Sequence, residues 1–257
     1  MLAEERRTRL LEMVRQRGFA SLPDLANALS VSESTVRRDL DFLEKSGEAK
    51  KTYGGVFYTG PSPKLPHFDQ RQAAHWEAKR LIGRRAAELI QDGDAVLFDG
   101  GSTTYEMAQC LVGRPLQVVT NSLPVANLFA SSDPADLVII GGDTHPRTGV
   151  TLGPFAIEML SKINVRWAVL SVAGVNERGY YNSSRLLVET ERAMMQAADE
   201  VIVVADSTKF GHSSVAHLCE LGQVQHLVVD HQINEDWRSR LAASGVNLIV
   251  AGPTDNG

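Results

Sequence analysis

Hydrophobic residues follow two different periods along this 257-residue chain. From residue 4 to residue 45 they recur three or four positions apart, which is typical of amphipathic helices. Further along, short runs rich in valine, isoleucine and leucine alternate with helical stretches. These β-rich runs cover residues 95–98, 117–120, 137–140, 168–172, 201–205, 227–229 and 248–250. The alternation predicts an α/β domain with a parallel or mostly parallel sheet, preceded by a smaller helical domain.

A proline-rich segment separates the two patterns. Residues 59–66 contain three prolines and a glycine, which interrupt both helices and strands. We therefore expect a first domain over residues 1–58, a linker over 59–68 and a second domain over 69–257. A helix predicted over 69–90 carries the chain from the linker to the sheet.

The first domain has the spacing of a helix-turn-helix. A helix from Glu4 to Arg17 is followed by Ser21 and Asp24, which resemble a capping box and predict the start of a second helix. A turn at Ser30 leads to a third helix over residues 33–45. The helix-turn-helix motif then covers about residues 20–39.

The third helix has two chemically different faces. At 100° per residue, Val36, Leu40 and Leu43 lie close together and predict the buried stripe. Arg37 and Arg38 lie on the other face, near the helix start, where a recognition helix meets base edges and arginine bonds guanine bidentately. We expect one of the two arginines to contact a base and the other to contact a phosphate, and the sequence does not assign which does which. The alternative is a solvated face with a surface pair between Arg38 and Asp41.

A hairpin is predicted after the third helix. Gly54 and Gly55 lie between β-forming residues and indicate a two-residue turn, which makes the hairpin a wing. Lys50 and Lys51 are expected to hold backbone phosphates beside the recognition helix, with Tyr53 nearby. The alternative is that these lysines only protect an exposed strand edge from aggregation. The candidate DNA-binding residues are Ser34, Thr35, Arg37, Arg38, Lys45, Lys50, Lys51 and Tyr53.

The net charge of the chain is unevenly divided between the two domains. The net charge is −5, which disfavours a nucleic-acid partner for the chain as a whole. Residues 1–58, however, carry 10 Lys and Arg against 9 Asp and Glu, whereas residues 59–257 carry 16 against 22. The acidic excess therefore belongs to the second domain, and the DNA hypothesis depends on where the arginines of the first domain lie.

Other features exclude several classes of protein. No apolar run approaches the roughly 20 residues of a membrane-spanning helix, and no signal peptide is evident, so a cytoplasmic protein is expected. Cys110 and Cys219 have no spacing that predicts a disulfide framework or a zinc ribbon. The seven histidines form no HExxH motif or tight cluster, and we expect no metal and no cofactor.

The amino-terminal residues resemble the signature of the DeoR (deoxyribose operon repressor) family of bacterial transcription regulators. Arg6, Leu10 and Val14 are followed by Ser32, then by Thr35-Val36-Arg37-Arg38-Asp39-Leu40 and by Tyr53-Gly54-Gly55-Val56 in the wing. Tyr53 departs from the histidine that is frequent in the family. The resemblance implies a winged helix-turn-helix domain that binds operator DNA.

A glycine turn in the second domain has the chemistry of an anion site. The run from Asp94 to Thr104 reads as a strand, a Gly100-Gly101 turn and three hydroxyl side chains, with a helix beginning near Tyr105. Exposed N–H groups, the helix dipole and the hydroxyl groups favour a phosphate, and glycines let it approach. The dinucleotide and nucleoside-triphosphate motifs are absent. The alternative is an ordinary turn with Ser102 as the helix cap.

Polar residues also follow several other predicted strands. The carboxyl ends of parallel strands meet at one edge of a sheet, where α/β proteins bind ligands. Lys209 is then the expected counter-charge for a phosphate, and Asp99 and Asn121 are expected partners of sugar hydroxyl groups.

The second half resembles the effector domain of the same family, whose fold is similar to ribose-5-phosphate isomerase and glucosamine-6-phosphate deaminase. The resemblance implies a phosphorylated sugar in this domain, and Glu189 matches an acidic position of a family motif. Glu191 stands where lysine is common, and Leu187 stands where a second acid is frequent. The residues implied around the effector are Asp99, Gly101, Ser102, Thr103, Thr104, Asn121, Gly142, Gly174, Glu189 and Lys209.

Two functions follow from these patterns. The first is a transcriptional regulator, a repressor of a carbohydrate-metabolism operon, that acts as a dimer or tetramer and changes its affinity for DNA when a sugar phosphate binds. The alternative is a sugar-phosphate isomerase or deaminase, with Asp99 or Glu189 as general base beside Lys209. The helix-turn-helix favours the first, because such an enzyme does not need one.

Overall fold

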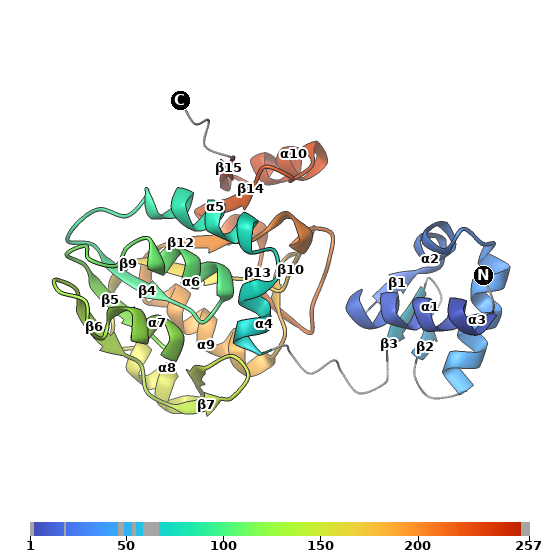
Figure 1. The fold of residues 1–257 in the computed structure, drawn as a ribbon, viewed down its shortest axis with the longest axis horizontal. Helices are drawn as coiled ribbons and strands as arrows, with labels where there is room; N and C mark the ends of the chain where they lie inside the picture. Colours follow the sequence, from blue (N-terminus) through green and yellow to red (C-terminus); the bar gives the residue numbers. More distant parts are fainter. Residues whose placement is uncertain (1–2, 18, 46–48, 53–54, 59–66, 253–257) are drawn as a thin grey trace. The chain divides into compact units, whose positions relative to one another are not determined.

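The computed structural model describes residues 3–17, 19–45, 49–52, 55–58 and 67–252. The chain divides into two compact units, Met1–Leu65 and Pro66–Gly257. Their elements are labelled in Figure 1. Helix α4 begins at Phe68, the last residue of the predicted linker.

The first unit has three helices and a small antiparallel sheet. The strands are arranged in the order β1-β3-β2. Ser21 caps α2, because its hydroxyl accepts a hydrogen bond from the Asp24 N–H at 3.3 Å, and Ser30 ends that helix in a left-handed conformation with φ 53°. The elements are α1 (Ala3–Arg17), β1 (Phe19–Ser21), α2 (Leu22–Leu29), α3 (Glu33–Lys45), β2 (Ala49–Thr52) and β3 (Gly55–Tyr58).

The apolar stripe predicted for α3 is confirmed. Val36 and Leu40 are completely buried, and Leu43 is nearly so. They pack in one core with Leu10 and Val14 of α1 and with Leu25 of α2. The three helices are therefore held together by the positions that the period of the sequence singled out.

The second unit is built on a seven-stranded parallel sheet, as predicted. Its strand order is β15-β14-β12-β9-β4-β5-β6, and every neighbouring pair is parallel (Figure 1). Each predicted β-rich run coincides with one of these strands, although the runs 137–140, 168–172 and 201–205 extend one residue beyond the strand end. They are β4 (Ala95–Phe98), β5 (Gln117–Thr120), β6 (Asp136–Ile139), β9 (Val165–Ser171), β12 (Ala198–Val204), β14 (His226–Asp230) and β15 (Asn247–Ala251).

Helices cover both faces of this sheet. One buried cluster joins α5, α6 and α7 to Val96 and Phe98, and another joins α8, α9 and α10 to Leu97. Successive residues of β4 thus point to opposite layers, as the pleat of a strand requires. The helices are α4 (Phe68–Ala73), α5 (Trp76–Ala87), α6 (Ser102–Gln109), α7 (Leu123–Phe129), α8 (Pro154–Leu160), α9 (Arg185–Gln196) and α10 (Glu235–Ala243).

Helices α5 and α6 cross at short distance through Gly83. A Cβ atom at Gly83 would lie 2.7 Å from the backbone of Glu106 and Met107, so a larger residue would separate the two helices. This close crossing fixes α5 against the helix that follows the Gly100-Gly101 turn.

Several predictions of element boundaries were wrong. The helix expected over 69–90 is two helices, α4 and α5, separated at His75, which has φ 54°. The helix expected near Tyr105 already begins at Ser102. Short antiparallel strands were not predicted, because they lack a long apolar run. They are β7 (Asp143–His145), β8 (Val150–Leu152), β10 (Gly174–Asn176), β11 (Gly179–Asn182) and β13 (Ala216–Cys219).

Membrane insertion has no support in the described part of the chain, where no helix combines the length and apolar character needed to span a bilayer. Cys110 and Cys219 are free thiols.

Candidate DNA interface and effector site

The exposed face of α3 carries the predicted DNA-binding side chains. Ser34, Arg38 and Lys45 are exposed, and the Arg37 side chain is 64% exposed with only a long contact of 3.9 Å to Glu33. Thr35 is half-buried, and its hydroxyl lies 2.9 Å from that of Ser32. Two guanidinium groups are therefore free to reach a partner from the start of this helix.

The next residue of the same motif points inward. Asp39 is 2% exposed, and its carboxylate accepts hydrogen bonds from Arg6 Nε at 2.5 Å and Arg7 Nε at 3.1 Å. The Arg7 guanidinium also lies 4.1 Å from the centre of the Phe42 ring. Asp39 thus ties α3 to α1 and orients the helix that carries Arg37 and Arg38, a role that the sequence analysis did not assign.

The hairpin strands are present, because β2 pairs antiparallel with β3. Thr52 pairs with Gly55, so Gly55 belongs to β3 and the predicted Gly54-Gly55 turn is wrong. The connecting residues 53 and 54 lie outside the described residues, and so does the predicted contact of Tyr53. The side chain of Lys50 is also outside the described part.

Lys51 has acidic partners in the DNA-free protein. Its ammonium donates to the Asp41 carboxylate and lies 3.6 Å from Glu44. This hydrogen bond raises the pKa of Lys51 and lowers that of Asp41. Asp41 therefore pairs with the wing and not with Arg38, the surface pair considered above.

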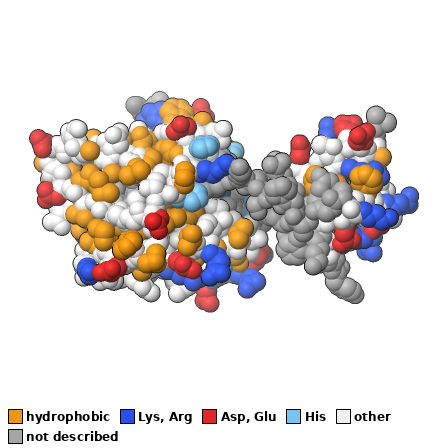
Figure 2. All heavy atoms as spheres, turned by 90° about the horizontal axis from the view of Figure 1, so that it is seen from below, with side chains coloured by type: hydrophobic (Ala, Val, Ile, Leu, Met, Phe, Trp, Pro, Cys, Tyr) orange, Lys and Arg blue, Asp and Glu red, His pale blue; other side chains and the backbone are white. Residues whose placement is uncertain are grey.

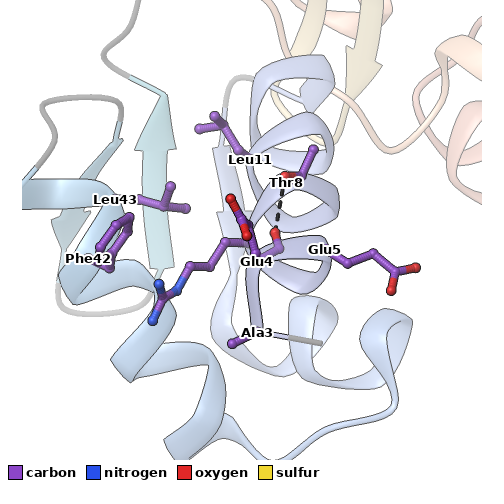
Figure 3. Close-up of a pocket in the computed structure, with 8 residues that line it drawn as sticks. Ala3, Glu4, Glu5, Thr8, Leu11, Phe42 and Leu43 are labelled. Carbon is purple, nitrogen blue, oxygen red and sulfur yellow. Dashed lines mark hydrogen bonds between the residues drawn. The ribbon is translucent and has the colours of Figure 1, made fainter. Parts of the chain in front are cut away.

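A groove of about 810 Å³ lies between α1 and α3. Figure 3 shows Phe42 and Leu43 of α3 facing Leu11, Thr8 and Glu4 of α1 across it. The groove is lined by Ala3, Glu4, Glu5, Arg7, Thr8, Leu11, Phe42 and Leu43. None of these belongs to the candidate DNA-binding set, so the groove and the candidate DNA face are different surfaces.

The second candidate site lies where the strand order of the sheet reverses. Strands β5 and β6 continue from β4 on one side, whereas β9, β12, β14 and β15 lie on the other side of it. The crevice at the carboxyl end of such a switch point is where open α/β sheets bind ligands. Asp99 follows β4 and Ser171 ends β9, so these two residues flank the switch point.

Asp99 shapes the turn between β4 and α6. It is 4% exposed and accepts hydrogen bonds from the Gly101 N–H at 2.8 Å, the Ser171 N–H at 2.8 Å and the Ser171 hydroxyl at 3.2 Å. Burial raises the pKa of Asp99, and the hydrogen bonds oppose that shift. Both carboxylate oxygens are occupied by protein donors, so Asp99 organises the site and is not placed to contact a sugar hydroxyl directly.

Gly101 is required here for packing. A Cβ atom at Gly101 would lie 1.7 Å from the Ser171 hydroxyl, so any other residue would push the turn away from β9. The sequence analysis expected this glycine to let a phosphate approach. In the structure, the group that approaches Gly101 closely is the protein's own Ser171.

Helix α6 begins at this turn with an uncapped N-terminus. Gly101 is the N-cap residue and offers no side-chain cap, so the alternative in which Ser102 caps the helix is wrong. Ser102, Thr103 and Thr104 form the first turn and are all buried. Unbonded N–H groups and the positive end of the helix dipole favour an anion at this point.

Three cations lie at this edge of the sheet, and two of them were missed by the sequence analysis. Lys209 is 32% exposed, with its ammonium 3.7 Å from Asp206 Oδ2. Arg71 of α4 donates from Nη2 to the Gly100 carbonyl at 3.5 Å. Lys79 of α5 is buried, and burial lowers its pKa to about 8, with Lys209 and Arg71 lowering it further and Asp206 and Glu106 opposing them.

Lys79 could have been recognised from its position in the helix. It shares the buried stripe of α5 with Ile82, Gly83 and Ala86, three, four and seven residues further on. A lysine on an apolar stripe is unusual, because a buried charge requires a partner. The position of Lys79 three, four and seven residues before buried apolar positions is therefore a sequence signal for a functional residue.

Several buried polar atoms at this edge of the sheet have no hydrogen-bond partner. They are Arg71 Nε, Asn121 Oδ1, Glu191 Oε2 and Asp206 Oδ2. Asn121 uses its amide nitrogen on the Thr151 carbonyl at 2.8 Å, which leaves its oxygen without a donor. Buried polar groups are nearly always satisfied in folded proteins, so four such atoms at one edge of the sheet indicate a site for a polar ligand.

The structure does not bring Glu189 to this group. Glu189 is exposed and pairs with Arg185 at 3.6 Å. Glu191 is the buried acid of α9: its Oε1 accepts from Asn182 at 2.6 Å, and burial together with the charge of Asp99 raises its pKa well above the usual range. The general bases of the enzyme hypothesis are therefore poorly placed, since Asp99 is saturated with donors and Glu189 lies elsewhere.

The two remaining predicted glycines have packing roles. A Cβ atom at Gly142 would lie 2.5 Å from the Leu152 carbonyl oxygen, and one at Gly174 would lie 2.6 Å from that of His212. They let β7 approach β8 and β10 approach the segment after Lys209. Among the described residues, no group of three or more His, Cys, Asp and Glu side chains could hold a metal ion.

Comparison with known proteins gives a consistent result for both units. The model of the DeoR C terminal sensor domain matches residues 74–231, and that of the DeoR-like helix-turn-helix domain matches residues 6–60. The HTH-type transcriptional regulator UlaR of Shigella dysenteriae serotype 1 (strain Sd197) is 29% identical over 250 residues, covering 97% of this chain and 99% of the relative. UlaR of Escherichia coli O1:K1 / APEC is 28% identical over the same shares.

Solved structures resemble the fold more distantly. Ribose 5 phosphate isomerase A from Neisseria gonorrhoeae is 16% identical, with a TM-score of 0.38 over 57% of this chain and 56% of that one.

Proposed function

The chain belongs to the DeoR family of helix-turn-helix transcriptional regulators, and from this premise we propose that a phosphorylated sugar bound in its second unit changes the affinity of its first unit for operator DNA. The regulated genes are those of a carbohydrate-metabolism operon, and the protein acts as a repressor. DNA binding itself follows from the family.

One observation supports a sugar phosphate as the effector. At the switch point of the sheet, the uncapped N-terminus of α6 lies in a region that also holds Arg71, Lys79, Lys209 and buried polar atoms without partners. A phosphate dianion supplies acceptors for the cations and N–H groups, and sugar hydroxyl groups supply donors for the unpartnered oxygens. A sugar phosphate satisfies both requirements at once.

The effector is proposed to contact the α6 N-terminus, Asn121 and Lys209 directly. Asp99, Gly101 and Gly174 shape the site without contacting the effector, because their contacts are with the protein itself. Glu189 is left out of the proposed effector site, because it is exposed and pairs with Arg185. The proposed effector-site set is Asp99, Gly101, Ser102, Thr103, Thr104, Asn121, Gly142, Gly174 and Lys209.

The operator is proposed to bind the exposed face of α3 and the wing. Arg37 and Arg38 supply base and phosphate contacts, and Lys51 must exchange part of its pairing with Asp41 and Glu44 for DNA phosphate. The proposed DNA-binding set is Ser34, Thr35, Arg37, Arg38, Lys45, Lys50, Lys51 and Tyr53.

A homo-oligomer is proposed because operators of this kind are read as paired half-sites. Figure 2 shows hydrophobic side chains spread over one face of the larger unit. Val138 and Ile139 of the end strand β6 are 43% and 47% exposed, and Phe155 of α8 is 70% exposed. An end strand with exposed apolar residues is a suitable contact between copies.

A thermal-shift screen of sugar phosphates tests the proposed effector. A compound present at roughly 100 times its dissociation constant stabilises the protein by about 2.7 kcal/mol, so a true effector raises the melting temperature measurably. Lys209→Ala should remove the shift, whereas Lys162→Ala, which changes an exposed lysine paired with Glu158, should keep it. A panel of sugar phosphates that leaves the melting temperature unchanged would refute the proposal.

A further inference from the structure

Helix α4 is held in place by a lysine from the next helix. The Lys79 ammonium donates to the Arg71 carbonyl and, at 2.6 Å, to the Ala74 carbonyl, both at the C-terminal end of α4. Lys79 is 4% exposed, so this attachment is inside the protein. A cation at the C-terminal carbonyls of a helix is stabilising, and here it fixes the turn of α4 that carries Arg71.

The Arg71 side chain is directed to the Gly100-Gly101 turn and is incompletely paired there. Its Nη2 reaches the Gly100 carbonyl only at 3.5 Å, and its Nε is buried without a hydrogen-bond partner. The charge of Asp99 acts on it. A guanidinium has five donors in a planar fork, so Arg71 has donors left for an acceptor with two oxygens.

Packing holds this guanidinium against the helix that starts at the turn. Arg71 lies 5.6 Å from the centre of the Phe68 ring, and Phe68 packs edge-on against Tyr105 of α6 at 5.3 Å. Gln72 adds a hydrogen bond of 3.3 Å to Glu106 of the same helix. The side chain is therefore preorganised beside the α6 N-terminus, which lowers the entropic cost of binding.

We propose that Arg71 is a ligand of the effector's phosphate group, bound through its free guanidinium donors beside the N-terminus of α6. This inference rests on the proposed function and adds a residue that precedes the segment matched by the sensor-domain model, residues 74–231. Because α4 is the first helix after residues 59–66, a phosphate bound to Arg71 also fixes the start of the second unit. Effector binding is thereby connected to the segment that leads to the DNA-binding unit.

The test compares variants of the full chain in titration calorimetry. The probes are inorganic phosphate, ribose 5-phosphate and fructose 6-phosphate, and the probe that the wild-type protein binds most tightly is used for the variants. Arg71→Met keeps the buried stem without the charge and should weaken binding by at least about tenfold, the loss expected for a charge-assisted hydrogen bond. Arg71→Lys keeps the charge without the planar fork and should recover part of that loss.

Arg80→Ala is the matched control. Arg80 is an exposed arginine of α5 whose guanidinium lies 5.0 Å from the centre of the Trp76 ring, and its removal should leave probe binding unchanged. Binding by Arg71→Met within twofold of the wild type would overturn the role of Arg71 and leave the proposed function intact. If Arg71→Met does not fold, Arg71→Lys decides, and wild-type affinity in that variant overturns the bidentate contact. Failure of the wild type to bind any of the three probes or other sugar phosphates would instead overturn the proposed function, and the role of Arg71 with it.

Discussion

Arg37, Arg38 and Asp39 are consecutive, yet they have opposite roles in the structure. The two arginines are exposed on α3, whereas Asp39 is buried between two arginines of α1. A helix turns by about 100° per residue, so a side chain next to an exposed pair can face the core. The positively charged pair is available for DNA because the adjacent acid is already neutralised by other residues.

Arg38→Ala should weaken binding to the preferred DNA sequence by about 1 to 3 kcal/mol and relax the choice of base at one position. The preferred sequence is first selected from a random pool, and binding is then measured by fluorescence anisotropy. Arg9→Ala is the control, because Arg9 is an exposed arginine of α1 that pairs with Glu5. Equal loss on all sequences would assign Arg38 to a phosphate and leave the base contact to Arg37.

Lys79 should make effector binding depend on pH. Its pKa is lowered to about 8 chiefly by burial, so the side chain is largely charged at pH 7 and largely neutral at pH 9. An anion nearby favours the charged form, so sugar-phosphate affinity should fall by up to about tenfold for each pH unit above 8. The phosphate is already a dianion in this range, since its second pKa is about 6. Calorimetry from pH 7 to 9 checks this, and a pH profile in Lys79→Arg identical to that of the wild type would contradict it.

The sequence predicted some residues of the site and missed others for physical reasons. Asp99, Asn121 and Lys209 follow buried strands of the parallel sheet, so their convergence follows from the sheet alone. Arg71 and Lys79 precede the first strand of the seven-stranded sheet, and their approach to the site depends on the bend at His75. A left-handed residue other than glycine has no strong sequence signal, so a continuous helix was predicted there.

At the scale of elements, the tie between α1 and α3 determines how the recognition helix is presented. The Asp39 carboxylate accepts hydrogen bonds from Arg6 and Arg7. The Arg7 guanidinium also stacks on Phe42, which lines the groove in Figure 3. Without the buried carboxylate, two arginines would lose their partner at once. The orientation of α3 thus depends on an ion pair as well as on its apolar stripe.

Asp39→Asn should lower the free energy of opening of the first unit, because it leaves the half-buried Arg6 and Arg7 without their counter-charge. All three tryptophans, Trp76, Trp167 and Trp237, lie in the second unit, so fluorescence does not report this loss. Hydrogen exchange of the α1 and α3 amides in the full chain does report it. Asp41→Asn, at an exposed position of α3, is the control, and equal protection in both variants would contradict the assigned role of Asp39.

The elements that could be predicted are those with strong periodicity. The strands of the seven-stranded sheet and the three amino-terminal helices follow directly from their apolar patterns. The short antiparallel strands, such as β7 and β10, have only three residues each, too few to show an alternation. Their pairing is set by tertiary contacts, including the close approaches at Gly142 and Gly174.

At the scale of the whole molecule, the account requires two sites on two compact units to influence one another. A compound that changes operator affinity must, by linkage, have its own affinity changed by the operator to the same extent. The chain between the units contains the proline-rich residues 59–66, and α4 follows them directly. The proposed phosphate contact at α4 therefore lies beside the segment that joins the two units, and the same phosphate contacts α6 inside the second unit.

The most direct test of this account is the operator affinity of the wild-type protein with and without the sugar phosphate that stabilises it most. The dissociation constant, measured by fluorescence anisotropy at fixed ionic strength, should change by about 5- to 150-fold at saturation. Lys209→Ala should bind the operator with unchanged affinity and lose the response. An operator affinity that stays the same while the sugar phosphate is bound would contradict the central claim.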